Sequence, residues 1–155
     1  MNRIVERGYS IEIIIEGLKM KIVTESFSVS SRNRNQMIDI TSRVHSIVGE
    51  SGIKDGDVVI YCPHTTAGIT INENADPDVP HDILLTLSEL IPQHRAGYRH
   101  SEGNSDAHCK SSIIGCSKQV LIKDGDMQLG TWQGIFFCEF DGPRSRKVYV
   151  QVRGE

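Results

Sequence analysis

Strand-like segments dominate the chain, and only two segments have a clear helical period, which restricts the fold more than any other feature of the sequence. Across residues 147–152, three valines fall on one face of an extended chain and polar or aromatic side chains fall on the other. Residues 57–62 are almost continuously apolar, which is typical of a central strand. Four further strands are predicted over residues 20–29, 67–72, 119–123 and 135–140.

The first helical segment has four apolar residues on one face, at Ile40, Val44, Ile47 and Val48. Asp39 or Thr41 can cap its start, and Gly52 is suited to end it. The second segment begins near Asp78 and ends before Pro92. Its apolar side chains form a stripe that we expect to be buried, made of Val79, Ile83, Leu84, Leu87, Leu90 and Ile91. A third, shorter helical turn is predicted over residues 106–114.

The order of these segments predicts an α+β fold. The chain has 155 residues, which suits one domain and excludes a complete (β/α)₈ barrel of about 200 residues or more. Because the helices are too few for regular alternation with strands, we expect a mainly antiparallel sheet or sandwich with two main helices packed on one face. Residues 20–155 are expected to form this single domain. Residues 1–19 are either an extra β-ribbon or an upstream extension that adds little to the fold.

Charge and cysteine content exclude several classes of protein. The 17 Lys and Arg residues against 20 Asp and Glu residues give a net charge of -3, so bulk charge does not favour nucleic acid as a partner. No run of about 18 apolar residues or secretory leader is recognised, so a membrane partner is not expected. The four cysteines form no C-x-x-C pair, and we expect them to be reduced thiols in the cytoplasm. Cys62 and Cys138 lie in apolar runs and are expected in the core.

The densest polar segment covers residues 98–110 and holds two histidines, His100 and His108. Polar residues around them can orient the rings or share a ligand: Glu102, Asn104, Asp106 and Lys110. Imidazole binds zinc and other divalent ions well, and His64, just after a predicted strand, can supply a third ring. The alternative is a solvated loop, since this histidine spacing is not a specific metal signature. The remaining histidines are assigned to the surface: His45, His81 and His94.

Cationic side chains near the other polar segments suggest an anion site. Arg144 and Arg146 carry guanidinium forks that suit phosphate oxygens, and hydroxyl donors follow His64 in the chain, at Thr65 and Thr66. In the alternative interpretation the two arginines neutralise nearby carboxylates, Glu139 and Asp141, in a structural network. The two interpretations can hold together. Trp132, the only tryptophan, either covers an apolar part of a ligand or belongs to the core, which base rates favour.

Four motifs run through these polar segments in a fixed order: His64-Thr65-Thr66-Ala67 followed by Asn72-Glu73, His100 followed by Asp106-Ala107-His108-Cys109-Lys110, Gly130-Thr131-Trp132-Gln133, and Glu139-Phe140-Asp141-Gly142-Pro143-Arg144. In this order they resemble the motifs of the YjbQ-like family of small proteins. The resemblance covers about residues 20–152, nearly the whole chain. Several linked motifs make it far more specific than any one of them alone.

The resemblance implies a compact α+β fold that assembles as a homotrimer, with the polar motifs in a cleft near the subunit interface. It also implies secondary thiamine-phosphate synthase activity and, as in some members, a bound metal ion such as zinc. By motif, the metal-binding imidazoles are expected at His64, His100 and His108. Catalytic groups are expected at Glu73, Asp106, His108 and Lys110. Substrate or anion contacts are expected at Thr65, Thr66, Asn72, Asn104, Trp132 and Arg144.

Three functions remain open on this basis. The first is a transferase that joins a pyrimidine diphosphate to a thiazole phosphate, a reaction that favours a divalent ion and cations on the departing pyrophosphate. Since the usual synthase is a (β/α)₈ barrel, this activity is expected to be a side activity. The second is a metal-dependent hydrolase of a phosphorylated metabolite, with Glu73 or Glu102 as base. The third is a non-catalytic trimeric module that binds a small phosphorylated molecule.

Overall fold

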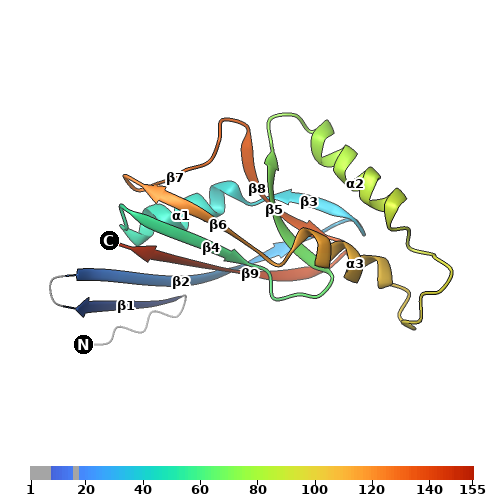
Figure 1. The fold of residues 1–155 in the computed structure, drawn as a ribbon, viewed down its shortest axis with the longest axis horizontal. Helices are drawn as coiled ribbons and strands as arrows, with labels where there is room; N and C mark the ends of the chain where they lie inside the picture. The colour runs from blue at the N-terminus through green and yellow to red at the C-terminus, as the bar shows by residue number, and fades with distance from the viewer. Residues whose placement is uncertain (1–7, 16–17) are drawn as a thin grey trace.

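The computed structural model describes residues 8–15 and 18–155 (Figure 1). Its strands are β1 Gly8–Ile15, β2 Leu18–Ser30, β3 Gln36–Asp39, β4 Gly56–Tyr61, β5 Ala67–Glu73, β6 Ser117–Lys123, β7 Asp126–Met127, β8 Gln133–Glu139 and β9 Ser145–Gly154. Its helices are α1 Thr41–Ser51, α2 Asp78–Leu90 and α3 Ser105–Ile114. All six predicted strands and both main helices are confirmed, and α3 covers the predicted third turn. The short strands β3 and β7 were not predicted, because four and two residues carry too little periodicity.

The strands form two sheets in which every described pair is antiparallel. The larger sheet has the order β1-β2-β9-β4-β6-β7, and the smaller has the order β3-β8-β5. Together with the helices they confirm an α+β fold with antiparallel sheets. Strand β1 pairs along the first part of β2, so residues 8–15 form the β-ribbon, one of the two alternatives for the N-terminal extension. No helix in the described residues is long and apolar enough to cross a membrane.

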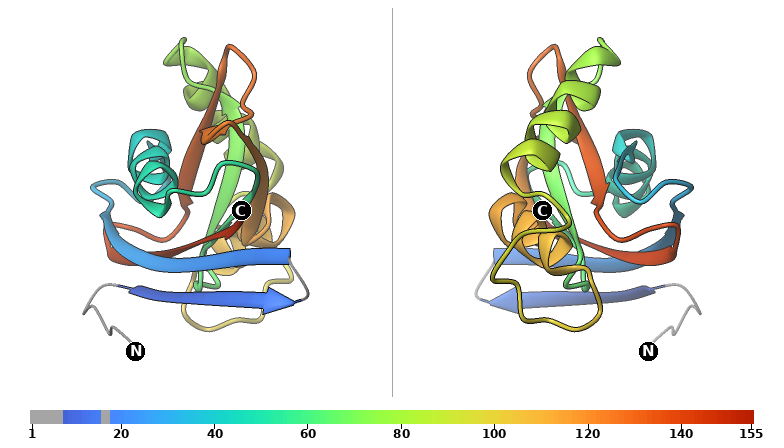
Figure 2. Two further views of the ribbon diagram at one scale, coloured as in Figure 1. Left: turned by 90° about the vertical axis from the view of Figure 1, so that its left-hand side faces the viewer. Right: turned by 90° about the vertical axis from the view of Figure 1, so that its right-hand side faces the viewer.

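The main core lies between the large sheet, α1 and one face of the small sheet (Figure 2). Helix α1 contributes Val44, Ile47 and Val48, all fully buried, from the face predicted by its period. The N-cap position is Ile40, not Asp39 or Thr41 as predicted, and it makes no side-chain capping bond. Asp39, one residue earlier, still accepts a hydrogen bond from the Thr41 N–H through Oδ1 at 2.8 Å. At the other end Gly52 has φ 71°, the left-handed conformation that favours glycine at a helix end.

A second, smaller core lies on the opposite face of the small sheet, under α2 and α3. Strand β8 is buried on both faces, so Ile135 and Phe137 enter the main core while Phe136 and Cys138 enter the second. Cys62 and Cys138 are buried as predicted, and burial raises the pKa of these thiols to about 11 and about 12. The helices therefore lie on both sides of the small sheet, with α1 on one side and α2 and α3 on the other.

The prediction that the apolar stripe of α2 is buried is wrong for the single chain. No residue of α2 is fully buried, and Leu90 is 69% exposed. Only Leu84 and Leu87 pack against the second core. The physical reason is that α2 lies over the margin of the small sheet, which is too narrow to cover the whole apolar face of the helix. The period identified the helix correctly, but it could not show how much surface was available to cover it.

We predict that Ile47→Ala lowers the free energy of unfolding by about 2–5 kcal/mol, because Ile47 is fully buried and its removal leaves a cavity. The matched control is Ile113→Ala, the same change at an exposed helical position, which should alter stability by less than about 0.5 kcal/mol. Chemical denaturation followed by circular dichroism measures both values. Similar losses in the two variants would contradict the placement of α1 in the core.

Candidate functional site

His64 lies in the short connection between β4 and β5, with its ring beside β9. Its Nε2 accepts a hydrogen bond from the Lys147 N–H at 2.8 Å, so the ring proton of the neutral form sits on Nδ1. Burial lowers the pKa of His64, and the positive charge of Arg146 lowers it further. His64 is thus a neutral imidazole whose Nε2 is already engaged by the backbone.

A buried ion pair joins the ends of β5, β8 and β9. Arg146 Nε and Nη2 donate to both carboxylate oxygens of Glu139 at 2.7 and 2.6 Å, and Nη2 also donates to Thr66 Oγ1 at 2.8 Å. Ser31 Oγ donates to the same carboxylate at 3.2 Å. Burial on its own raises the pKa of the Glu139 carboxyl, but Arg146, the Asp141 N–H and Ser31 together hold it below its ordinary value. The structural interpretation of Arg146 and Glu139 is therefore confirmed.

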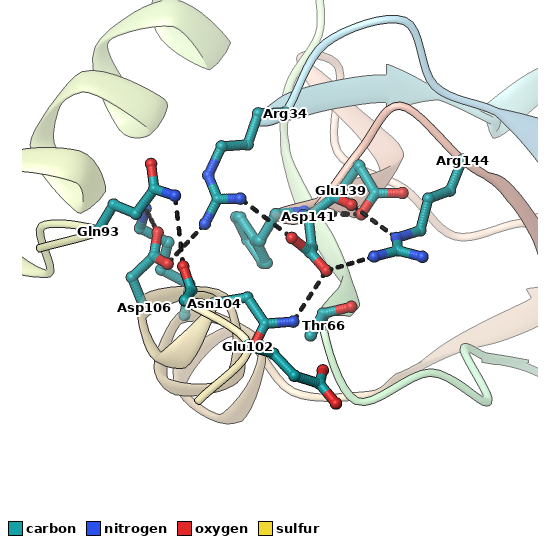
Figure 3. Close-up of polar contacts among 12 residues, drawn as sticks. Arg34, Thr66, Gln93, Glu102, Asn104, Asp106, Glu139, Asp141 and Arg144 are labelled. Carbon is teal, nitrogen blue, oxygen red and sulfur yellow. Dashed lines mark hydrogen bonds and ion pairs between the residues drawn. The ribbon is translucent and has the colours of Figure 1, made fainter. Parts of the chain in front are cut away.

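A second charged network anchors α3 (Figure 3). Lys110 Nζ donates to Asp106 Oδ2 at 2.9 Å, one helical turn away, and both side chains are almost fully buried, at 2% and 1% exposure. Arg34 spans the gap to the next loop, donating to Asp106 Oδ1 at 2.7 Å and to Asp141 Oδ1 at 3.0 Å. Arg34 was missed from the sequence because a single arginine in the Ser/Asn/Arg-rich segment 31–36 carries no local signal.

Asp141 is the point at which this network meets the surface. Its Oδ2 accepts hydrogen bonds from Asn104 Nδ2 at 3.0 Å and from Arg144 Nη2 at 2.8 Å. Burial raises the pKa of Asp141, but Asn104, Arg144 and Arg34 outweigh it and keep the pKa low. Asn104 is only 6% exposed, yet its Oδ1 has no hydrogen-bond partner among the described residues. A buried acceptor of this kind requires a partner, such as water or a ligand N–H.

His100 and His108 come together beside this network. Their rings are 5.3 Å apart between centroids and nearly perpendicular, at 84°. With Ser105 and Cys109 they line a pocket of about 320 Å³. His108 is on α3, which packs so closely on β5 that a Cβ atom at Gly68 would lie 2.7 Å from the Gly115 carbonyl oxygen. The helix thus holds one imidazole of the pair on a rigid support.

The predicted three-histidine metal site is not assembled within one chain. Across residues 8–15 and 18–155, no three His, Cys, Asp or Glu side chains are grouped so that they could hold a metal ion. His100 and His108 form a pair, whereas the Nε2 of His64 bonds to the backbone of β9. The described residues therefore offer two neighbouring imidazoles, one fewer than the three protein ligands of a typical catalytic zinc site.

The remaining predicted site residues are divided between the two ends of the small sheet. Thr66 precedes β5 at the end where Ala67 pairs with Glu139, while Asn72 and Glu73 lie at the other end, where Glu73 pairs with Gln133. Six residue steps of a strand separate these ends by about 20 Å. Trp132 belongs to the far end and is 62% exposed, so the expectation that it lies in the core is wrong. Thr65 is exposed, and its carbonyl oxygen accepts a hydrogen bond from Ser111 Oγ.

Comparison with known proteins identifies the family. The model of the UPF0047 (YjbQ-like) family matches residues 25–155. The chain belongs to this family. A UPF0047 protein of Methanocaldococcus jannaschii is 57% identical over 129 residues, which cover 83% of this chain and 93% of the relative. The UPF0047 protein YugU of Bacillus subtilis is 52% identical over 130 residues, covering 84% and 98% of the two chains.

Solved structures of UPF0047 proteins have the same fold. A YjbQ/UPF0047 protein from Clostridium acetobutylicum superposes with a TM-score of 0.80 at 56% identity, covering 82% of this chain and 98% of its own. A protein of unknown function from Sulfolobus solfataricus superposes with a TM-score of 0.85 at 34% identity, covering 88% and 99%. The arrangement of sheets and helices around the histidine pair is therefore that of a family whose function these relatives leave open.

We predict that the buried Glu139 carboxylate makes this UPF0047 chain sensitive to acid. Because its pKa is lowered by folding, the ionised group stabilises the fold above the ordinary value of 4.5, and this contribution is lost as the pH falls through the lower folded pKa. Glu139→Gln should cost about 3 kcal/mol at neutral pH by leaving Arg146 unpaired, and should flatten the fall in stability as the pH drops from neutral to below 4.5.

Denaturation curves across this pH range measure the effect. Glu102→Gln is the control, because Glu102 is exposed and the same change there should leave the curve as in the unmodified protein. An equally steep fall for Glu139→Gln would show that another group is responsible for the acid sensitivity.

Proposed function

We propose that this chain is an enzyme that acts on a phosphorylated small molecule, with thiamine-phosphate synthesis as a secondary activity. The observation that supports the proposal best is the imidazole pair of His100 and His108, which lines a pocket beside a fully ion-paired network. Imidazoles are the side chains best suited to move protons near neutral pH. The family resemblance supplies the named reaction, and the site supplies groups that suit it.

The proposed reaction joins a pyrimidine diphosphate to a thiazole phosphate. A bond forms between the thiazole nitrogen and the pyrimidine methylene carbon, and the bond from that carbon to oxygen breaks as pyrophosphate leaves. Arg144 is an exposed cation that can meet the departing charge, and Asp141 holds its guanidinium in place through both a side-chain and a main-chain oxygen. Asp106 and Lys110 are buried and paired, so they serve here as positioning residues that hold α3.

A divalent metal ion, with zinc as the candidate, is part of this proposal. His100 and His108 would hold it, and further ligands would have to come from outside the described pair. Such an ion supplies electrostatic stabilisation of phosphate oxygens when bound. Titration of the protein with zinc, with and without a chelator, tests this part separately from turnover.

Assembly as a homotrimer completes the proposal. In one chain Asn72, Glu73 and Trp132 lie at one end of the small sheet, about 20 Å from the end where Ala67 pairs with Glu139. A site between copies of the chain is therefore the arrangement that can unite the motifs. Two large apolar side chains of α2, Leu85 and Leu90, are exposed, and no residue of this helix is fully buried in the single chain. We place this assembly in the cytoplasm, where the four thiols would remain reduced.

We predict that sedimentation or light scattering at micromolar concentration gives a mass three times the chain mass of 17.3 kDa. The physical reason is that burying the exposed apolar face of α2 removes it from water. A mass equal to one chain at all concentrations would contradict the trimer and leave Glu73 without a role in the site.

Hydrolysis of a phosphate ester is the second candidate. It is favoured by Glu102, whose Oε2 lies 3.5 Å from His100 Nε2 and which is free to reach a water molecule from its exposed position. Incubation with a set of phosphate esters, compared with incubation with the pyrimidine and thiazole substrates, separates the two reactions. Tight binding with no turnover of any compound would instead indicate a non-catalytic module.

We predict that His108→Ala reduces turnover by about 100-fold without unfolding the protein, because the imidazole moves a proton or holds a ligand in either reaction. Product formation is measured by chromatography, and folding by circular dichroism. His81→Ala is the matched control, since His81 is an exposed imidazole at the start of α2 and should not affect turnover. Unchanged turnover in His108→Ala would refute the proposed site.

A further inference from the structure

The segment between α2 and α3 lines an open pocket of its own. Gln93 Nε2, labelled in Figure 3, donates to the Gly103 carbonyl at 3.3 Å, which holds the two ends of the segment together. Within the segment, the Tyr98 N–H donates to the Arg95 carbonyl at 3.2 Å and closes a turn. The pocket has a volume of about 330 Å³. All of its lining residues lie within residues 93–105, and among them only His100 was predicted as a site residue.

The side chains that line this pocket are donors and cations. Arg95 carries a permanent positive charge, His94 and His100 are imidazoles, and Tyr98 and Ser105 offer hydroxyl groups. Among the described residues that line it, none is an aspartate or a glutamate. Glu102 Oε2 lies 3.5 Å from His100 Nε2, but Glu102 does not line the pocket. A pocket with this lining favours an anion over a cation or a neutral molecule.

The pocket also adjoins the pocket of the histidine pair. His100 and Ser105 line both of them, so the two volumes share a wall. The first pocket is rich in donors and contains Arg95. The second is lined by His108 and Cys109 in addition to the two shared residues. A single molecule with an anionic end and a less polar body can therefore occupy both pockets.

We propose that the pocket formed by residues 93–105 binds the phosphate group of the substrate, with Arg95 as its principal ligand. A guanidinium presents two parallel N–H donors to phosphate oxygens, and Tyr98 and Ser105 can supply further donors. The rest of the substrate then extends past His100 toward His108. This inference rests on the proposed function for the substrate class, but binding of the anion itself requires no turnover.

The test uses inorganic phosphate and pyrophosphate as probes of the full-length protein, with binding followed by calorimetry or by NMR shifts. Arg95→Gln is expected to raise the Kd for both anions by about tenfold, because the charged fork is lost. Arg99→Gln is the matched control: it makes the same change in charge on the same segment, but Arg99 does not line the pocket. The control should bind as the unmodified protein does.

Every outcome of this test either supports or overturns phosphate binding by Arg95. Equal weakening by Arg95→Gln and Arg99→Gln would show that general charge attracts the anion and would overturn the proposal, as would absence of binding up to about 10 mM. If Arg95→Gln is destabilised, Arg95→Lys replaces it, and an intermediate Kd is expected since the charge remains but the fork is lost. His108→Ala should keep anion binding while losing turnover, which separates failure of this pocket from failure of the proposed function.

Discussion

The buried pair of Arg146 and Glu139 is the interaction on which the rest of the structure depends. A carboxylate with no exposed surface is tolerated only when its charge is paired and its oxygens accept hydrogen bonds. Arg146 provides two of these bonds, and Ser31 and backbone amides after β8 provide others. Since these groups come from β8, β9 and the chain after β2, the pair holds the two sheets together at the end where Ala67 pairs with Glu139.

The second network extends this rigid point to the surface. Glu139 accepts a hydrogen bond from the Asp141 N–H, and the Asp141 side chain in turn accepts hydrogen bonds from Arg34 and Asn104. Arg34 continues to Asp106 on α3, so the helix that carries His108 is tied through charged contacts to the core of the molecule. Buried ion pairs contribute little net stability but allow few alternative arrangements, which is useful where side chains must stay in place for binding or catalysis.

Much of the architecture could be predicted from the sequence, because periodicity reports directly on which faces are buried. The valines of β9 and the apolar face of α1 are clear cases. The imidazole pair of His100 and His108 was also expected, since both lie in one short segment. Arg34 could not be found in this way, because its importance comes from two carboxylates that are far away in the chain, Asp106 and Asp141. The sequence left open whether Trp132 covers a ligand or lies in the core, since a lone tryptophan has no periodic partner, and the structure excludes the core.

The sequence by itself determined the longer strands, the helices and the family, because these depend on local patterns and on the order of motifs. Only the tertiary structure decided which motif residues meet. An antiparallel strand carries its residues away from each other at about 3.4 Å per step, so Thr66 and Glu73 lie at opposite ends of β5 although they are close in the chain. In the same way, Arg146 reaches Thr66 across 80 positions because the starts of β9 and β5 lie side by side. Sequence order cannot encode such distances, since they arise only when the sheets pack.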